Sequence, residues 1–450
     1  MMASFLMHRI RYTIIVLCCC VSLAQAATPK VQSWVSSQGA KVMYVQADTL
    51  PMLDIRIVFA AGSAWDSELP GLAQFTNVLL TEGAGDWDAQ TLASRVEAEG
   101  IQLGSAAYRD MASVSVRTLT TQPALSVAVD SLAKVLGEPR FAVDSIAQIR
   151  QQLLVGLRYT AQSPGKVAAE KLYQTLYGNH PYAHPISGTA DSLAKITRRD
   201  IQAFHHQYYV AANAVIALVG DIDQKTAEKI AEQVSAKLQP GQAAPALPMP
   251  ESVSEQRKSV PFPASQSHLY LGRFGVTRHD PDYFPLYVGN HILGGSTLNS
   301  LLGDAVRHQR GLSYSVYSYF RPMQVPGPFV MVAQTQNAQA ETALQVMRSV
   351  LQQFMVQGPT QAQLQAAQQY LTGNFPLSVA SNQKIVEYIA MIGFYDLPLD
   401  WLATLPDKLA AVTAEQVRSA FQRRIQPQQQ VTVIVGGEVQ DQEVLFSADK

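Results

Sequence analysis

The spacing of hydrophobic and polar residues predicts that this chain mixes strands with helices. Apolar residues occupy every second position over residues 53–60, which is typical of a strand with one buried face. Val114 and Val116 indicate a second strand by the same spacing. Over residues 344–354 apolar residues recur at intervals of three and four, which predicts an amphipathic helix. This mixture of elements favours an α+β fold.

One local pattern occurs twice in the chain. Thr197 and Thr413 are each followed, three residues later, by Asp or Gln, which is the spacing of a capping box at a helix start. Each of these predicted helices precedes an apolar, β-branched strand that ends in glycine, at Gly220 and Gly436. Both pairs of residues are separated by the same interval of 216 positions. The equal intervals predict a tandem duplication.

Proline density marks the boundary between the two copies. Residues 239–263 contain six prolines, at positions 240, 245, 248, 250, 261 and 263. Since proline lacks the backbone N–H and disrupts helices and central strands, we expect an extended linker over this segment. The linker divides the chain into an N-terminal domain, residues 27–238, and a C-terminal domain, residues 264–450.

The first 26 residues have the pattern of a secretory signal peptide. Arg9 and Arg11 precede a short apolar run that contains Cys18–Cys20, and the run ends in Ala-Gln-Ala. An uncleaved anchor and a buried helix are the two alternatives. Cleavage after Ala26 would remove all three cysteines, and with them any disulfide, thiolate ligand or cysteine nucleophile. No later segment is long and apolar enough to span a membrane.

Composition and a search for catalytic motifs narrow the function classes. With 34 basic and 35 acidic residues the chain lacks the basic surplus expected of a protein that binds nucleic acid. There is no H-E-x-x-H, G-x-S-x-G, P-loop or G-x-G-x-x-G motif. His180 and His184 are each followed by proline in a predicted loop, and the adjacent His205 and His206 should point in different directions on a helix. The residues alone therefore predict a secreted, two-domain α+β protein.

Three segments carry more specific motifs: FAAGS at 59–63 with GLAQFTNVLL at 71–80; YGNHP at 177–181 with GT at 188–189, YY at 208–209 and VGD at 219–221; and LGGS at 293–296 with RHQRGLSYSV at 307–316. Together they resemble the M16 family of insulinase- and pitrilysin-type metallopeptidases, which includes the mitochondrial processing peptidase. The resemblance covers nearly the whole chain after the predicted signal peptide. It implies two tandem homologous α/β-roll domains, each a mixed, mainly antiparallel sheet packed with helices.

The sequence departs from this family at the metal site. Active members carry an inverted zinc motif, H-x-x-E-H, in which two histidines bind the metal and the glutamate activates water. The matching positions here are Gln74, Asn77 and Val78. Valine cannot ligate zinc, glutamine is a poor zinc ligand, and an amide cannot act as a general base. Residues 153–158, where the resemblance places a glutamate ligand, contain no acid. We therefore expect no metal in this chain and a helix that serves only for packing.

A second family feature is retained. The family pairs an arginine with a tyrosine seven residues later, and Arg307 and Tyr314 have this spacing. In the family the arginine holds substrate, and the tyrosine hydroxyl donates a hydrogen bond near the scissile carbonyl as negative charge develops. Without the resemblance, Arg307 would be interpreted as a solvated helix residue and Tyr314 as a strand residue with a half-buried ring.

The resemblance implies a catalytically incomplete subunit that needs a zinc-bearing M16 partner. The two subunits, as a heterodimer or a higher heteromer, would form a zinc endopeptidase that acts on peptides, with zinc held by the partner. The predicted signal peptide places the complex in the periplasm of a Gram-negative bacterium. The alternative is a non-enzymatic structural or peptide-binding scaffold of the same fold. For an autonomous enzyme with a different site, the sequence offers no supporting constellation of residues.

Overall fold

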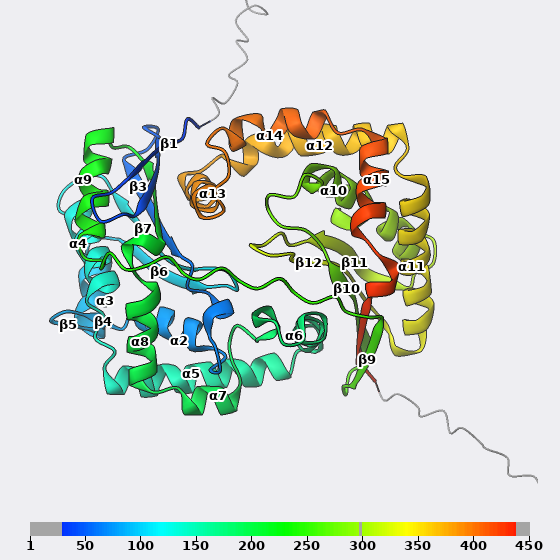
Figure 1. Ribbon diagram of the computed structural model, residues 1–450, viewed down its shortest axis with the longest axis horizontal. Coiled ribbons are helices and arrows are strands. Elements are labelled where there is room, and N and C mark those ends of the chain that lie inside the picture. The colour runs from blue at the N-terminus through cyan, green and yellow to red at the C-terminus, as the bar shows by residue number, and fades with distance from the viewer. Residues whose placement is uncertain (1–28, 297–298, 438–450) are drawn as a thin grey trace, which may run out of the picture.

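The computed structural model describes residues 29–296 and 299–437, so the predicted signal peptide lies outside the described residues. Two β-sheets, each packed with helices, face one another across the centre of the molecule (Figure 1). The predicted α+β fold is confirmed.

The first half of the chain forms a six-stranded sheet in the order β1-β2-β8-β3-β7-β6. Its strands are β1 (Gln32–Val35), β2 (Lys41–Gln46), β3 (Met52–Phe59), β6 (Gln102–Ala107), β7 (Ala112–Leu119) and β8 (Ala214–Gly220). Neighbours are antiparallel except β2 and β8, which are parallel. The other elements of this half are η1 (Ser63–Trp65), α2 (Leu72–Leu79), β4 (Gly83–Ala84), β5 (Trp87–Asp88), α3 (Ala89–Ala98), α4 (Ala124–Gly137), α5 (Val143–Ala161), α6 (Pro164–Tyr177), η2 (Pro181–Ala183), α7 (Ala190–Lys195), α8 (Arg198–Tyr208), η3 (Ala211–Asn213) and α9 (Gln224–Ser235).

The second half forms a five-stranded sheet in the order β11-β12-β10-β13-β9. Its strands are β9 (Gln256–Pro261), β10 (Gln266–Phe274), β11 (Ser313–Phe320), β12 (Pro328–Gln336) and β13 (Val431–Gly436), and only β9 and β13 run parallel. The helical elements are α10 (Tyr283–Asn290), the π-helical segments η4 (His291–Gly295) and η5 (Gly303–His308), the 3₁₀ turns η6 (Asn337–Gln339) and η7 (Pro427–Gln429), α11 (Ala340–Gln357), α12 (Gln361–Ser378), α13 (Asn382–Phe394), α14 (Trp401–Ala410) and α15 (Ala414–Arg424).

The repeated pattern in the sequence is a repeated structure. Thr197 and Thr413 both form complete capping boxes, at the starts of α8 and α15. Each helix spans 11 residues, and the strands that follow, β8 and β13, end at Gly220 and Gly436. The helix and strand predicted from these intervals thus occur in both halves of the fold.

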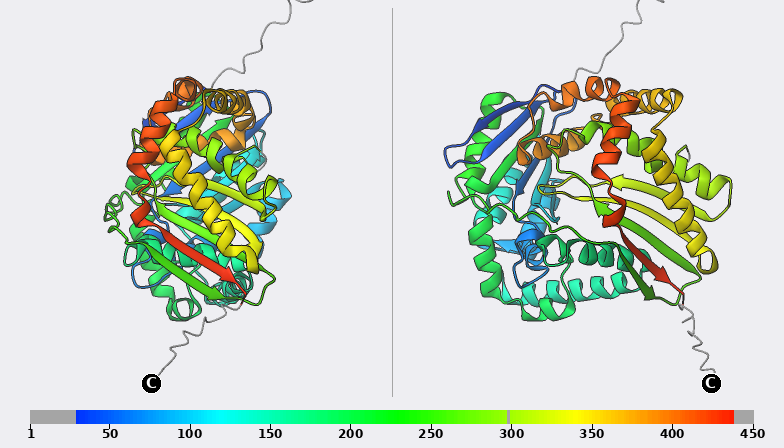
Figure 2. Two further views of the ribbon diagram at one scale, coloured as in Figure 1. Left: turned by 90° about the vertical axis from the view of Figure 1, so that its right-hand side faces the viewer. Right: turned by 45° about the vertical axis from the view of Figure 1, so that its right-hand side comes forward.

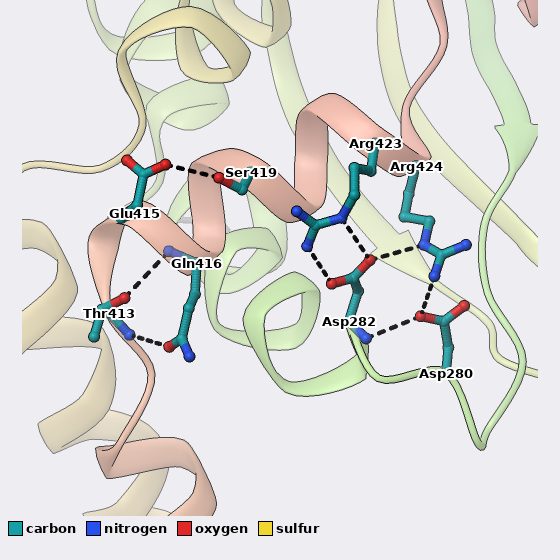
Figure 3. A network of polar contacts seen from close by, with 8 residues as sticks. All are labelled: Asp280, Asp282, Thr413, Glu415, Gln416, Ser419, Arg423 and Arg424. Atoms are coloured by element: carbon teal, nitrogen blue, oxygen red, sulfur yellow. Dashed lines mark hydrogen bonds and ion pairs between the residues drawn. The ribbon is translucent and has the colours of Figure 1, made fainter.

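A cluster of ion pairs fastens the second copy of the repeated helix to α10 (Figure 3). Asp282, the residue before α10, accepts hydrogen bonds from Arg423 Nη2 at 2.6 Å and Arg424 Nε at 2.8 Å. Asp280 accepts a further bond from Arg424 Nη2 at 2.9 Å. Burial opposes ionisation of Asp282, but the two arginines outweigh it and lower the pKa of this carboxyl group. The C-terminal end of α15 is therefore held to the start of α10.

The expectation that residues 239–263 stay outside the sheets is wrong for Gln256–Pro261. These residues form β9, which pairs in parallel with β13 from Val431–Gln256 to Gly436–Pro261. Within β9 the one proline is its last residue, Pro261. Because β9 lies at the edge of the sheet, the missing N–H of this proline removes no hydrogen bond to a second neighbouring strand. The preceding residues 240–255 form no helix or strand, as the proline density predicts.

The two halves exchange one helix each. Helix α6, from the first half, packs on β10 and β13 of the second sheet, while α13, from the second half, packs on β8 and β3 of the first sheet (Figure 1). The two helices are separated by nearly the interval that relates the repeats. Each sheet thus buries one face against a helix of the other half, which ties the halves into one packed unit.

The exchange explains why the strand β3 is buried on both faces. Leu53, Ile55 and Ile57 lie in a first hydrophobic cluster with the helices of their own half. Val58 points the other way and belongs to a second cluster, which includes Ile389 of α13. The alternating pattern correctly predicted the strand and its inner face, but the burial of the reverse face depends on a helix that lies more than 300 positions later. No helix in the described part of the chain is long and apolar enough to cross a membrane.

Candidate functional site

Helix α2 carries the positions of the degenerate zinc motif. Asp66 precedes it and accepts hydrogen bonds from the backbone N–H groups of Gly71 and Ala73, both at 2.7 Å. This carboxyl group is 1% exposed, and burial raises the pKa of Asp66 to about 8. The apolar residues Leu72, Phe75 and Leu79 are buried in the first hydrophobic cluster. The sequence therefore makes α2 a capped, packed helix.

The motif positions on α2 do not form a metal site. Asn77 is 0% exposed, and its Nδ2 donates hydrogen bonds to the carbonyl of Ser113 at 3.3 Å and to the hydroxyl of Tyr209 at 3.1 Å. Val78 is partly buried against the first cluster, and Gln74 Oε1 is a buried oxygen without a hydrogen-bond partner among the described residues. The amide nitrogen of Asn77 is thus already used to hold α2 against β7.

Zinc does not fit these residues. Val78 has no donor atom, and the nitrogen of the Asn77 amide is a hydrogen-bond donor that carries no lone pair for a metal. Within residues 29–296 and 299–437, no group of three or more His, Cys, Asp or Glu side chains could hold a metal ion. Of the side chains at residues 153–158 on α5, Leu153, Leu154 and Leu157 are partly buried against the first cluster, and Val155 is exposed. The chain has apolar surface where the family resemblance places a ligand.

Arg307 and Tyr314 lie side by side in the second half of the chain. Arg307 is near the end of the π-helical segment η5, and Tyr314 is the second residue of β11. Gly311, with a φ of +60°, turns the chain between them, and its N–H donates to the carbonyl of Arg307 at 2.9 Å. The guanidinium carbon of Arg307 lies 4.8 Å from the centre of the Tyr314 ring, within the range of a cation–π contact.

A β-bulge directs Tyr314 outward. Ser313 of β11 pairs with Thr335 of β12, but the next pair is Ser315 with Gln334, so Tyr314 is the extra residue. The hydroxyl of Ser313 lies within hydrogen-bond distance of the carbonyl oxygens of Ser315 and Gln334, at 2.7 and 2.8 Å, and a bond to either stabilises this irregularity. Bulges commonly re-aim a side chain near a functional site. As a result Tyr314 is 82% exposed, whereas a regular strand residue was expected to have a half-buried ring.

The predicted site residues therefore fall into two groups. Gln74, Asn77 and Val78 lie in the first half on α2, and Arg307 and Tyr314 lie in the second half beside the second hydrophobic cluster. Figure 1 places α2 and β11 in different halves of the molecule. The structure brings together the two members of the Arg–Tyr pair and leaves the degenerate motif apart from them.

A polar cavity between the halves was not predicted from the sequence. Asp110 is 3% exposed and lies in the turn between β6 and β7. It accepts hydrogen bonds from the hydroxyl of Tyr182 in its own half, and from the hydroxyl of Tyr395 at 2.8 Å and the N–H of Gln324 at 2.9 Å in the other half. Burial raises the pKa of Asp110, although these donors oppose the shift. This carboxyl group links the two halves.

Arginines surround this linking carboxyl group. Arg56, Arg109, Arg278 and Arg321 line a cavity of about 440 Å³ together with Asp110. Arg109 is 8% exposed, and its guanidinium lies 3.5 Å above the ring of Tyr173. The residues come from distant parts of the chain, so no local motif could have revealed the cavity. The adjacent Arg109 and Asp110 in a short turn were the one available indication.

Known proteins resemble the chain over both halves. The family model described as insulinase (peptidase family M16) matches residues 41–190, and the one described as peptidase M16 inactive domain matches residues 195–371. A crystal structure of a peptidase M16 inactive domain from Pseudomonas fluorescens is 41% identical, covers 91% of this chain and 98% of that chain, and has a TM-score of 0.88.

Two curated relatives carry contrasting names. An uncharacterized zinc protease of Bacillus subtilis, YmxG, is 23% identical over 354 residues, which cover 78% of this chain and 85% of that protein. A Helicobacter pylori protein named non-peptidase homolog YmxG is 24% identical over 378 residues, which cover 84% of this chain and 87% of that protein. The fold and these matches define a protein of the peptidase M16 type. This chain belongs to the M16 family.

Proposed function

We propose that this chain is the non-zinc subunit of a heteromeric M16 zinc endopeptidase. The chain would pair with a partner subunit that carries an intact H-x-x-E-H motif and would complete the partner's active site. The observation that carries this proposal is the contact between Arg307 and Tyr314 on a chain whose own motif helix cannot hold zinc. The pair has no evident packing role in the isolated chain, because the ring of Tyr314 is 82% exposed.

Each member of the pair has a distinct task in this proposal. The hydroxyl of Tyr314 donates a hydrogen bond to the scissile carbonyl as negative charge develops on its oxygen. The Arg307 guanidinium binds the peptide and, through its position 4.8 Å from the ring centre, limits the orientations of Tyr314. The guanidinium and the phenolic hydroxyl are both hydrogen-bond donors. Water activation is left to the partner subunit.

Two further observations support an incomplete subunit. The chain's relative in Helicobacter pylori is named a non-peptidase homolog, and the similar Pseudomonas fluorescens structure is described as an M16 inactive domain. In this chain Asn77 uses its amide nitrogen to bind Ser113 and Tyr209, so the helix has a packing role in place of a catalytic one. We therefore infer that the isolated chain does not hydrolyse peptides.

The proposed location is the periplasm of a Gram-negative bacterium. It rests on the basic start, the short apolar run and the Ala-Gln-Ala sequence within residues 1–26. Sequencing the N-terminus of the protein from a periplasmic extract tests this part: a start at Ala27 supports it. An intact N-terminus on protein in the cytoplasmic fraction contradicts it.

Mixing experiments test the pairing. The chain and the H-x-x-E-H subunit from the same genome are purified separately, and their association is measured by sedimentation velocity. We expect a 1:1 complex, or a multiple of it, that hydrolyses a quenched fluorescent peptide at least tenfold faster than either protein alone. A chain that stays separate from the zinc-bearing subunit, or that adds nothing to its turnover, contradicts the proposal.

The alternative function is a peptide-binding or structural scaffold without a catalytic role. The arginine-lined cavity between the halves favours it, because guanidinium groups bind carboxylates well without any chemistry taking place. A stable homodimer that binds peptides and ignores the zinc-bearing subunit is the expected behaviour of such a scaffold.

A further inference from the structure

A second cavity lies on the side of the second sheet that faces away from the first half. Helix α11 crosses this side of the sheet (Figure 2). The cavity has a volume of about 470 Å³ and is lined by Arg273 of β10 and Arg348 of α11. Its other walls are formed by Glu255, Leu351, Gln352, Met355, Val356, Gln422 and Gln430. The cavity shares no lining residue with the cavity around Asp110.

Arg273 is buried and makes no ion pair within the described residues. The side chain is 6% exposed, and its Nη2 donates a hydrogen bond to Oε1 of Gln430, a neutral acceptor. The other terminal nitrogen, Nη1, is buried and has no hydrogen-bond partner among the described residues. A buried guanidinium normally has a carboxylate partner, because its desolvation is costly.

Arg348 faces the same cavity and likewise makes no ion pair with the residues that the structure describes. Its Nη2 donates to the hydroxyl of Thr432 at 2.9 Å, and the same hydroxyl accepts a bond from Gln430 Nε2 at 3.1 Å. Arg348 Nε is buried without a partner in the part of the chain that the structure describes. The two guanidinium groups are thus joined through Gln430 and Thr432, with neutral groups between two positive charges.

This arrangement is electrostatically unfavourable by itself. Burial, and then repulsion from Arg348, lower the pKa of Arg273 to about 10. Glu255 lies close enough to oppose this shift, but within the described residues it makes no ion pair with either arginine. Glu255 is itself exposed to solvent. A bound anion would remove the repulsion and satisfy the free N–H groups.

We propose that this cavity binds an aliphatic carboxylate, with Arg273 and Arg348 holding the carboxylate oxygens. Guanidinium groups bind carboxylates through paired, charge-assisted hydrogen bonds. Leu351, Met355 and Val356 give the cavity an apolar wall, which suits an alkyl body better than an inorganic anion. This site is independent of the proposed peptidase role, since none of its residues belongs to the Arg307–Tyr314 pair.

Calorimetric titration of the full chain with octanoate, acetate and inorganic phosphate tests the proposal. We expect octanoate to bind at least about tenfold more tightly than acetate or phosphate, because only octanoate uses the apolar wall. Arg348→Gln should weaken octanoate binding by about tenfold to a hundredfold, since it removes a charged donor. Arg199→Gln, at an exposed position in the other half, serves as the matched control and should change nothing.

Glu255 is the alternative to an external anion as the partner of the two arginines. If the cavity needs an external anion, Glu255→Gln should leave octanoate binding unchanged or tighten it, because it removes a competing carboxylate. Failure of octanoate to bind, or equal binding by the Arg348→Gln variant, overturns the proposal. The proposal is also overturned if octanoate does not bind the unaltered chain and Glu255→Gln has a lower thermal stability, because Glu255 would then be the counter-ion. Arg348→Lys retains the positive charge. If this variant still binds octanoate, the weaker binding of Arg348→Gln comes from loss of the charge and not from misfolding.

Discussion

The guanidinium carbon of Arg307 lies 4.8 Å from the centre of the Tyr314 ring, on a chain whose zinc-motif positions are Gln74, Asn77 and Val78. The contact exists because Tyr314 is the extra residue of a β-bulge and turns away from the sheet. A regular β11 would direct this ring differently, so the bulge is part of the candidate site. The exposed ring is available to a partner or a peptide.

The exchanged helices depend on glycines at their contacts. A Cβ on Gly393 of α13 would lie 2.6 Å from Val215 Cγ1 and 2.9 Å from Met43 Cγ, both in the first sheet. Gly393→Ala should therefore lower the free energy of unfolding by about 1–3 kcal/mol through overpacking. Urea denaturation followed by circular dichroism measures this change.

Gly373→Ala is the matched control for that prediction. Gly373 lies in α12 with nothing within 4 Å of an added Cβ, so alanine should stabilise the chain by about 0.5–1 kcal/mol. If Gly393→Ala also stabilises the chain, the close packing of α13 on the first sheet is wrong.

Asn77 should matter for stability and not for metal binding. Asn77→Asp replaces a donor of two hydrogen bonds by a buried carboxylate that would face the carbonyl oxygen of Ser113. We expect a loss of about 2–4 kcal/mol in the free energy of unfolding at neutral pH. Asn179→Asp, at an exposed position, should have little effect. Equal stability of the two variants would mean that α2 does not use Asn77 for packing.

Mild acid should remove a contribution that His205 makes to stability. The imidazole is 6% exposed, contacts the carbonyl of Leu136 through Nε2 at 2.8 Å, and stacks on Tyr209. Burial lowers the pKa of His205 from 6.5 to about 4. Between these values the unfolded chain binds the proton at His205 and the folded chain does not, so the contribution of His205 to stability falls as the pH decreases from about 6.5 to 4, whereas Asp66, with its raised pKa, contributes in the opposite direction. The contribution is on the order of 3 kcal/mol.

His206→Gln provides the comparison for this pH effect, because His206 is the exposed neighbour on the same helix. Between pH 4 and 7 the unfolding free energy should rise less with pH in His205→Gln than in the unaltered chain, and His206→Gln should differ from the unaltered chain less than His205→Gln does. A slope that is the same in all three proteins would remove His205 as the cause.

Local signals in the sequence predicted the repeated parts of the fold. The alternation over residues 53–60 identified β3, and the Thr197 and Thr413 capping boxes identified α8 and α15 because both depend on residues three positions apart. The loss of the zinc motif on α2 could also be recognised from the sequence, because the ability of a side chain to bind zinc depends on its residue type. These features need no knowledge of distant contacts.

Such local patterns could not predict the long-range contacts. The exchange of α6 and α13 joins residues from opposite halves, and the link from Asp110 to Tyr395 spans 285 positions. β9 was missed because residues 256–260 are mostly polar and are flanked by prolines, so only the pairing with β13 identifies the strand. The bulge at Tyr314 arises from pairing with β12, and the residues next to Tyr314 in the sequence do not indicate it. Each of these features is set by tertiary packing.

The most direct test of the account is the turnover of the complex with the zinc-bearing subunit when Tyr314 is changed to phenylalanine. We expect that Tyr314→Phe still forms the complex but lowers the rate of peptide hydrolysis roughly tenfold to a thousandfold, with kcat affected more than KM. Tyr317→Phe, two residues beyond the bulge on the same strand, should retain near-normal turnover. Equal turnover of the Tyr314→Phe complex and the unaltered complex would contradict the claim that this chain contributes to catalysis.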